Sequence, residues 1–109
     1  MLDMESARSI YEAIRASSLD ELKEDLFRYA VSYAQERSRW RLASSEERRD
    51  MDEHRSRVHT CFIDSCTILA RNQQKTQEDS SWRGRLGTDR RTIGDLACWI
   101  QLFLALEAR

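Results

Sequence analysis

Proline is absent from this chain of 109 residues, and glycine occurs three times, at Gly84, Gly87 and Gly94. These two residue types interrupt helices most reliably, because proline lacks an amide hydrogen and glycine loses the most conformational freedom on folding. All three glycines lie in one stretch just before and at the start of the most apolar segment. The sequence upstream is free to be helical, and we expect an all-α fold.

Several other features are missing. No run of 18 or more apolar residues occurs, and the N-terminus lacks the basic and apolar regions of a secretory signal. Three cysteines are an odd number that suits reduced thiols better than a disulfide framework. A net charge of −1 gives no overall attraction to nucleic acid or acidic lipid. We therefore expect a cytoplasmic protein without a membrane partner, folded as one domain over residues 1–109.

Apolar residues recur at helical spacing in four segments, which predicts helices over about residues 2–16, 19–42, 45–73 and 89–107, with a loop over about 74–88. Ser18 with Glu21, and Ser44 with Glu47, have the spacing of a capping box. Thr88 or Asp89 can cap the last helix. The pattern predicts a compact four-helix, bundle-like domain with an apolar C-terminal helix at its centre. Trp82, the large apolar residue of the loop, is expected to pack against this body.

The last predicted helix is apolar on two faces. One broad face carries most of its large residues, and a second face carries Trp99, Leu102 and Leu106, leaving a narrow strip with Gly94, Gln101 and Ala105 for water. We expect Trp99, Leu102 and Leu106 to anchor an interface with a second copy (a homodimer) or another protein, with Arg91 on its rim. Alternatively, the N-terminal helix and the Trp82 loop cover this face within the monomer.

Three basic residues, Arg37, His54 and Arg55, fall within or beside apolar stripes of the second and third helices. Their side chains either reach the surface at a helix end or form an internal ionic network with acids such as Asp25, Asp64 or Asp95. A further alternative is that the three converge on one pocket for a small anion.

Charge is unevenly distributed along the chain. Residues 1–25 hold seven acids and three bases, whereas residues 71–91 hold six bases and three acids. The basic stretch includes Arg83, Arg85, Arg90 and Arg91, which flank glycines and lead into a helix, a setting that favours phosphate binding. Binding of nucleic acid or another anion here is therefore the alternative function, and a solvated loop that pairs with the acidic N-terminal helix is its simpler explanation.

Chemical motifs are lacking. His54, His59, Cys61 and Cys66 lie close in sequence, but helical phase divides them between two faces, so they do not predict one metal site. No nucleophile elbow, phosphate loop, dinucleotide fingerprint or zinc-ligand spacing occurs. We expect neither enzyme activity nor a cofactor, and we predict a non-enzymatic protein that acts through protein–protein interaction or homo-oligomerisation.

Overall fold

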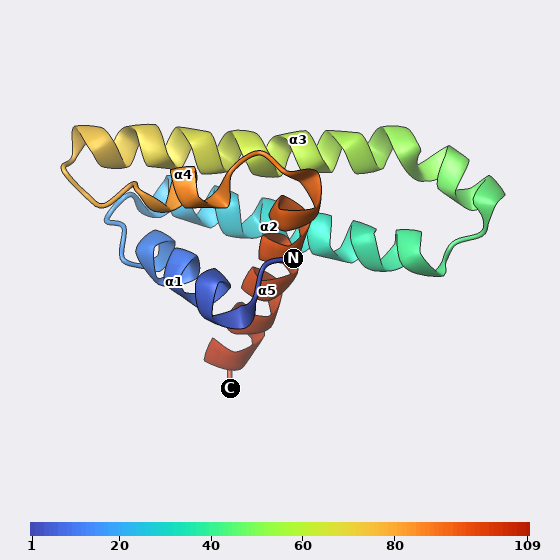
Figure 1. Cartoon of the computed structure of the whole chain (residues 1–109), viewed down its shortest axis with the longest axis horizontal. Helices are drawn as coiled ribbons and strands as arrows, with labels where there is room; N and C mark the ends of the chain where they lie inside the picture. The colour runs from blue at the N-terminus through green and yellow to red at the C-terminus, as the bar shows by residue number, and fades with distance from the viewer.

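The computed structural model describes residues 1–109 and contains five helices and no strand: α1 (Met4–Arg15), α2 (Asp20–Leu42), α3 (Ser45–Lys75), α4 (Trp82–Leu86) and α5 (Arg90–Glu107) (Figure 1). The all-α, bundle-like prediction is confirmed. All four predicted helices form, and their ends lie within two residues of those expected. No helix combines the length and the hydrophobicity that crossing a membrane requires.

The two longest helices, α2 and α3, run side by side in opposite directions (Figure 1). The turn between them is short because a capping box starts α3, as predicted: the Ser44 side chain accepts a hydrogen bond from the Glu47 amide, and the Glu47 carboxylate accepts one from the Ser44 amide. At 1.5 Å per residue, the 31 residues of α3 reach about 46 Å. This length accounts for the long dimension of the molecule, 47 Å.

Helix α1 lies on the side of α2 that faces away from α3, whereas α5 crosses α2, with its first turns close to α3 and its C-terminal end pointing away from α3 (Figure 1). Together the five helices enclose a core of 19 buried apolar side chains. The largest fully buried ones include Tyr33 of α2, Phe62 of α3 and Trp82 of α4. Burying a side chain such as Leu or Phe contributes about 1.5–3 kcal/mol, so this single core holds the helices together.

Helix α4 corrects the prediction of a continuous loop over residues 74–88. Trp82 and Leu86 are four residues apart, share one face of this short helix, and are both buried. The Trp82 indole N–H donates to the Gln73 side-chain oxygen at 2.7 Å, which satisfies a buried donor and fixes α4 against the end of α3. Gly87 then ends α4 with a φ of +70°, a conformation that favours glycine. Trp82 packs inside the protein, as expected.

The capping prediction at Ser18 is wrong. Residue Leu19 occupies the cap of α2 without a side-chain hydrogen bond, and the Ser18 hydroxyl donates instead to the carboxylate of Glu78. The Ser17 hydroxyl donates to the same carboxylate. Donation by these two hydroxyls lowers the pKa of Glu78 to about 2. The α1–α2 turn is thus held by the segment that follows α3. At α5, Asp89 is the cap and accepts from the Thr92 amide.

Candidate functional site

Helix α5 buries one face and exposes the other, as its sequence indicates. Ile93, Leu96, Ile100 and Phe103 are buried, whereas Leu102 and Leu106 remain 45% and 44% exposed. The C-terminal end of α5 projects beyond α1 and away from α3 (Figure 1). The alternative that the N-terminal helix and the Trp82 loop cover the second face is therefore wrong for Leu102 and Leu106.

Trp99 plays a different part from the one expected. Its side chain is half-buried, its ring stacks on Phe103 with centroids 5.9 Å apart, and its indole N–H donates to the backbone oxygen of Leu2 at 2.9 Å. The Leu2 amide in turn donates to the Asp95 carboxylate. Trp99 thus holds the N-terminal segment against α5. Only part of its ring is exposed, so it borders the exposed face of α5 and is not free to insert into a partner.

We define the outer strip as Trp99, Leu102, Ala105 and Leu106. At 100° per residue these side chains span about 120° of the helix surface. Ala105 is also exposed, and all four side chains of the strip are apolar or aromatic. It forms a continuous apolar surface over about two helical turns.

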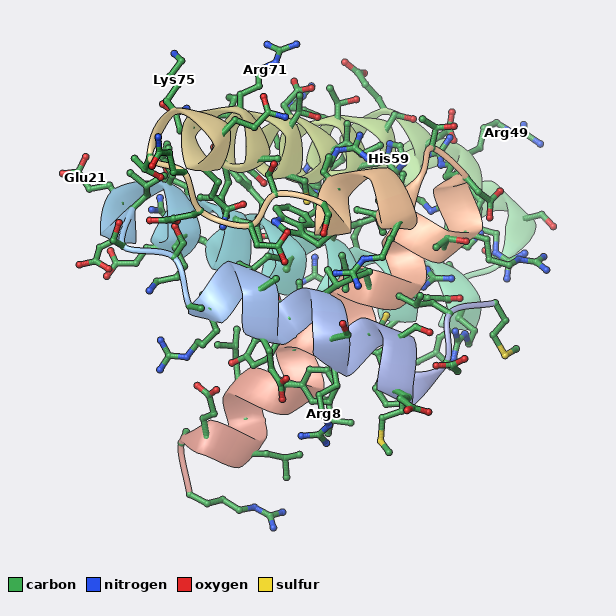
Figure 2. All side chains as sticks on the ribbon, turned by 60° about the vertical axis from the view of Figure 1, so that its left-hand side comes forward. Arg8, Glu21, Arg49, His59, Arg71 and Lys75 are labelled. Atoms are coloured by element: carbon green, nitrogen blue, oxygen red, sulfur yellow. The ribbon has the colours of Figure 1, made fainter.

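Contacts with α1 close the side of α5 next to the outer strip. The Arg8 guanidinium lies 4.9 Å from the Phe103 ring centroid, and Figure 2 shows Arg8 beside the C-terminal half of α5. Arg15 and Glu107 form an ion pair at 3.1 Å. Between these contacts lies a hollow of about 430 Å³, which Leu106 also lines. Burial and the Glu107 carboxylate raise the pKa of Tyr11, at the floor of this hollow, to about 12, so this phenol stays neutral.

Arg37 belongs to an internal ion pair. Its guanidinium lies 3.1 Å from the Asp95 carboxylate, and both side chains are less than one-fifth exposed. Gly94 makes this possible, because a Cβ there would lie 2.8 Å from Arg37 Nε. The expectation that Gly94 faces water is therefore wrong: α5 is buried at this point under the Arg37 side chain.

Arg37, His54 and Arg55 do not converge on one pocket, which corrects that alternative. His54, on α3, is exposed, and its Nε2 lies 3.4 Å from the buried carboxylate of Glu36 on α2. The Arg55 guanidinium stacks on Trp40, 4.3 Å from the ring centroid. Arg37 and Arg55 do share a pocket, but without His54.

The four arginines around the glycines do not form one surface. Arg83 donates to the Gly87 backbone oxygen and to Thr67, and Arg85 donates to Ser9 of α1. Arg90 and Arg91 lie at the start of α5 and line a separate pocket. Arg91 therefore lies more than two turns before Trp99, at the opposite end of α5 from Leu106.

That separate pocket, the arginine pocket, has a volume of about 340 Å³ and is lined by Tyr33, Arg37, Arg55, Asp89, Arg90 and Arg91. His59 lies close by, with its ring edge-on to Tyr33 at 5.2 Å. Figure 2 shows His59 on the face of α3 turned toward α4 and the start of α5. Burial, together with the charges of Arg90 and Arg55, lowers the pKa of His59. The sequence pointed to Arg37 with Arg55 and to Arg90 with Arg91 as two separate anion-binding candidates, and it did not show that they share one pocket, because these arginines come from three different helices.

The thiols offer no paired site. Cys61, Cys66 and Cys98 are all free, and burial raises the pKa of Cys66 to about 12, which leaves that thiol protonated and unreactive. No group of three or more His, Cys, Asp and Glu side chains is arranged to hold a metal ion.

Comparisons with protein-family models, with curated proteins and with solved structures find no match for this chain. Two features of its own structure stand out as places for binding. One is the outer strip of α5, which is apolar and exposed, and the other is the arginine pocket, which is strongly basic.

Proposed function

We propose that this chain is a non-enzymatic binding protein that associates with a second copy of itself through the outer strip of α5. The observation that carries the proposal is the exposure of Leu102 and Leu106, at 45% and 44%, on a helix whose opposite face is buried in the core. Exposed apolar side chains scattered singly need no partner, but neighbours on one helix face form a patch that gains free energy when water is removed from it.

The spacing of the outer strip favours a helix as its partner. Trp99, Leu102 and Leu106 are separated by three and then four residues, which is the spacing of the contact seam in paired helices. Two copies of α5 packed antiparallel about a two-fold axis near Leu102 would place Leu106 of each copy over Trp99 of the other. The hollow between α1 and α5, beside Leu106, gives the partner's side chains room to insert.

A second copy is the simplest partner, because a two-fold contact uses the same patch twice and closes the assembly. Four residues over two turns make an interface smaller than the standard size, so we expect a weak, reversible dimer. The free thiols support a cytoplasmic location, since reducing conditions keep cysteines unpaired.

Anion binding is the second candidate function, and the arginine pocket favours it. An extended nucleic-acid surface has less support, because Arg83 and Arg85 are engaged within the chain and point to other neighbours than Arg90 and Arg91 do. Nucleic-acid readers need a basic face that follows the phosphate backbone over several contacts.

Charge placed in the outer strip tests the proposal. We expect Leu102→Glu and Leu106→Glu to abolish the concentration-dependent rise in mass measured by sedimentation equilibrium, because a charge buried between two copies would be unpaired. Both positions are half exposed, so the helical circular dichroism spectrum should be unchanged.

Ile68→Glu is the matched control, because Ile68 is also 45% exposed but lies on α3. This variant should associate like the unmodified protein. If Ile68→Glu prevents association while Leu102→Glu does not, the interface lies on α3 and the proposal is wrong. Equal association of all three variants would also contradict it.

A further inference from the structure

The arginine pocket brings together basic side chains that are distant in sequence. Arg37 comes from α2, Arg55 from α3, and Arg90 and Arg91 from the first turn of α5. Packing four guanidinium groups around one hollow is electrostatically unfavourable unless negative charge is nearby. The arrangement of the available carboxylates therefore decides what the pocket can do.

Those carboxylates do not balance the pocket. Asp95 pairs with Arg37, but Arg55, Arg90 and Arg91 form no ion pair. Asp89 lines the pocket, yet its carboxylate already caps α5 by accepting from the amide and the hydroxyl of Thr92. Four guanidinium groups thus face two carboxylates, which leaves an excess of two positive charges.

Hydrogen-bonding capacity is also unused there. The Nε–H of Arg55 is buried and has no hydrogen-bond partner, and the same holds for Nε2 of the neighbouring His59. A buried donor left without a partner costs about 1–3 kcal/mol. The first amides of α5, at Arg90 and Arg91, have no helical carbonyl to bond, as at any helix start. An oxyanion in the pocket would offer acceptors to the Arg55 Nε–H and to these first amides of α5.

We propose that the arginine pocket binds a small anion that carries a phosphate group, held by the guanidinium groups of Arg55, Arg90 and Arg91. A phosphate group with two negative charges matches the excess of two positive charges, and its oxygens suit the paired donors of arginine. Arg37 is a positioning residue, which Asp95 and Gly94 fix at the pocket wall. The stacking of Arg55 on Trp40 holds its guanidinium in place before the anion arrives.

The size of the pocket favours a small molecule over a nucleic-acid strand. About 340 Å³ is at the lower end of the range for small-molecule sites. The other arginines of the 71–91 stretch do not continue the pocket, since Arg83 and Arg85 are bonded elsewhere in the chain. Contact with a single phosphate group, rather than with a series of phosphates, is what this geometry supports.

Titration with inorganic phosphate and pyrophosphate, at constant ionic strength maintained with chloride, tests the proposal. Calorimetry should show saturable binding, and Arg90→Gln and Arg55→Gln should each weaken it about tenfold or more, since a charge-assisted hydrogen bond contributes about 1.5–3 kcal/mol. Arg90 is exposed, so its replacement leaves the core intact. Arg71→Gln is the matched control, because Arg71 is exposed on α3 and forms no ion pair; Figure 2 shows it projecting outward from α3.

His59 provides a readout at the pocket itself. Burial, and after it the charges of Arg90 and Arg55, lower the pKa of this imidazole. A bound phosphate offsets the two charges and should therefore raise the His59 pKa, which NMR titration of the ring can follow. Phosphate should produce this shift in the unmodified protein and in Arg71→Gln. Absence of saturable binding, or equal weakening by Arg71→Gln, would overturn the proposal. Tighter binding of a short single-stranded oligonucleotide that depends on Arg83 and Arg85 would overturn it in favour of nucleic acid.

Discussion

Replacing Trp82 by phenylalanine removes one hydrogen bond and part of one ring from the buried core. Trp82 is fully buried, and its indole N–H donates to the Gln73 side-chain oxygen at 2.7 Å. Gln73 is itself 1% exposed, so water does not reach the acceptor that the substitution leaves without a donor. Helix α4 depends on this anchor because five residues are too few to form a stable helix alone.

Two terms set the expected loss of stability. Leaving the Gln73 oxygen buried without a donor costs about 1–3 kcal/mol. The smaller ring also gives up buried apolar contact and leaves a small gap, for about another 1 kcal/mol. We therefore expect Trp82→Phe to lower the free energy of unfolding by about 2–4 kcal/mol, a large share of the total stability of a small domain.

Urea denaturation followed by circular dichroism measures this loss. The control is Trp40→Phe, because Trp40 is only partly buried and its ring lies under the guanidinium groups of Arg48 and Arg55. The loss of stability in this variant should be less than about 1 kcal/mol. A double-mutant cycle with Gln73→Leu should show coupling of about 1 kcal/mol or more. Equal losses for Trp82→Phe and Trp40→Phe, or additive effects in the cycle, would refute this explanation of α4.

Three further predictions concern other parts of the fold. Serine hydroxyls hold the pKa of Glu78 at about 2, below the ordinary 4.5. The stability advantage of the unmodified protein over Glu78→Gln is therefore complete above pH 4.5 and disappears as the pH falls toward 2. If the urea midpoints of the two proteins differ by the same amount at every pH, this prediction is contradicted. Ser44→Ala should lower the free energy of unfolding by about 1 kcal/mol through loss of the α3 cap, and an unchanged urea midpoint would argue against the capping box. In Gly94→Ala, the new methyl group must displace the Arg37 guanidinium, so phosphate affinity should fall. The gain in helix propensity, about 1 kcal/mol, should offset only part of the stability lost when the Arg37–Asp95 ion pair is disturbed. Undiminished phosphate affinity in calorimetry would count against the positioning role of Arg37.

Features of the fold that depend on neighbours in sequence could be predicted. The Ser44 cap and the Asp89 cap each join residues three apart, and the apolar spacing of α5 follows from the helical repeat. Helix α4 could not be predicted in this way, because Gly84 disfavours it and burial of Trp82 and Leu86 in the finished core stabilises it. Tertiary packing overrides weak local propensity at this point.

The capping prediction at Ser18 is wrong because a tertiary contact overrides the local sequence pattern there too. Its spacing to Glu21 favours a cap, but the carboxylate of Glu78, sixty residues away in sequence, takes its hydroxyl hydrogen bond. The helical repeat places Gly94 on the strip of α5 that its two apolar faces leave for water, whereas the crossing of α2 over α5 places Arg37 on it. Which residues meet across two helices depends on crossing angles that one sequence pattern does not specify.

The two candidate sites also differ in how far the sequence could predict them. The exposed positions of Leu102 and Leu106 follow from the period of one helix, so the sequence could indicate them. The arginine pocket needs three helices to converge, and the sequence separated its members into two groups, one with Arg37 and Arg55 and the other with Arg90 and Arg91.

Solution mass tests the proposed self-association most directly. Light scattering of the unmodified protein should give a mass that rises from 12.9 kDa toward twice that value between roughly 10 μM and 1 mM, as a small, reversible helix–helix interface requires. A mass that stays at 12.9 kDa across this range would contradict the proposal that the outer strip of α5 joins two copies.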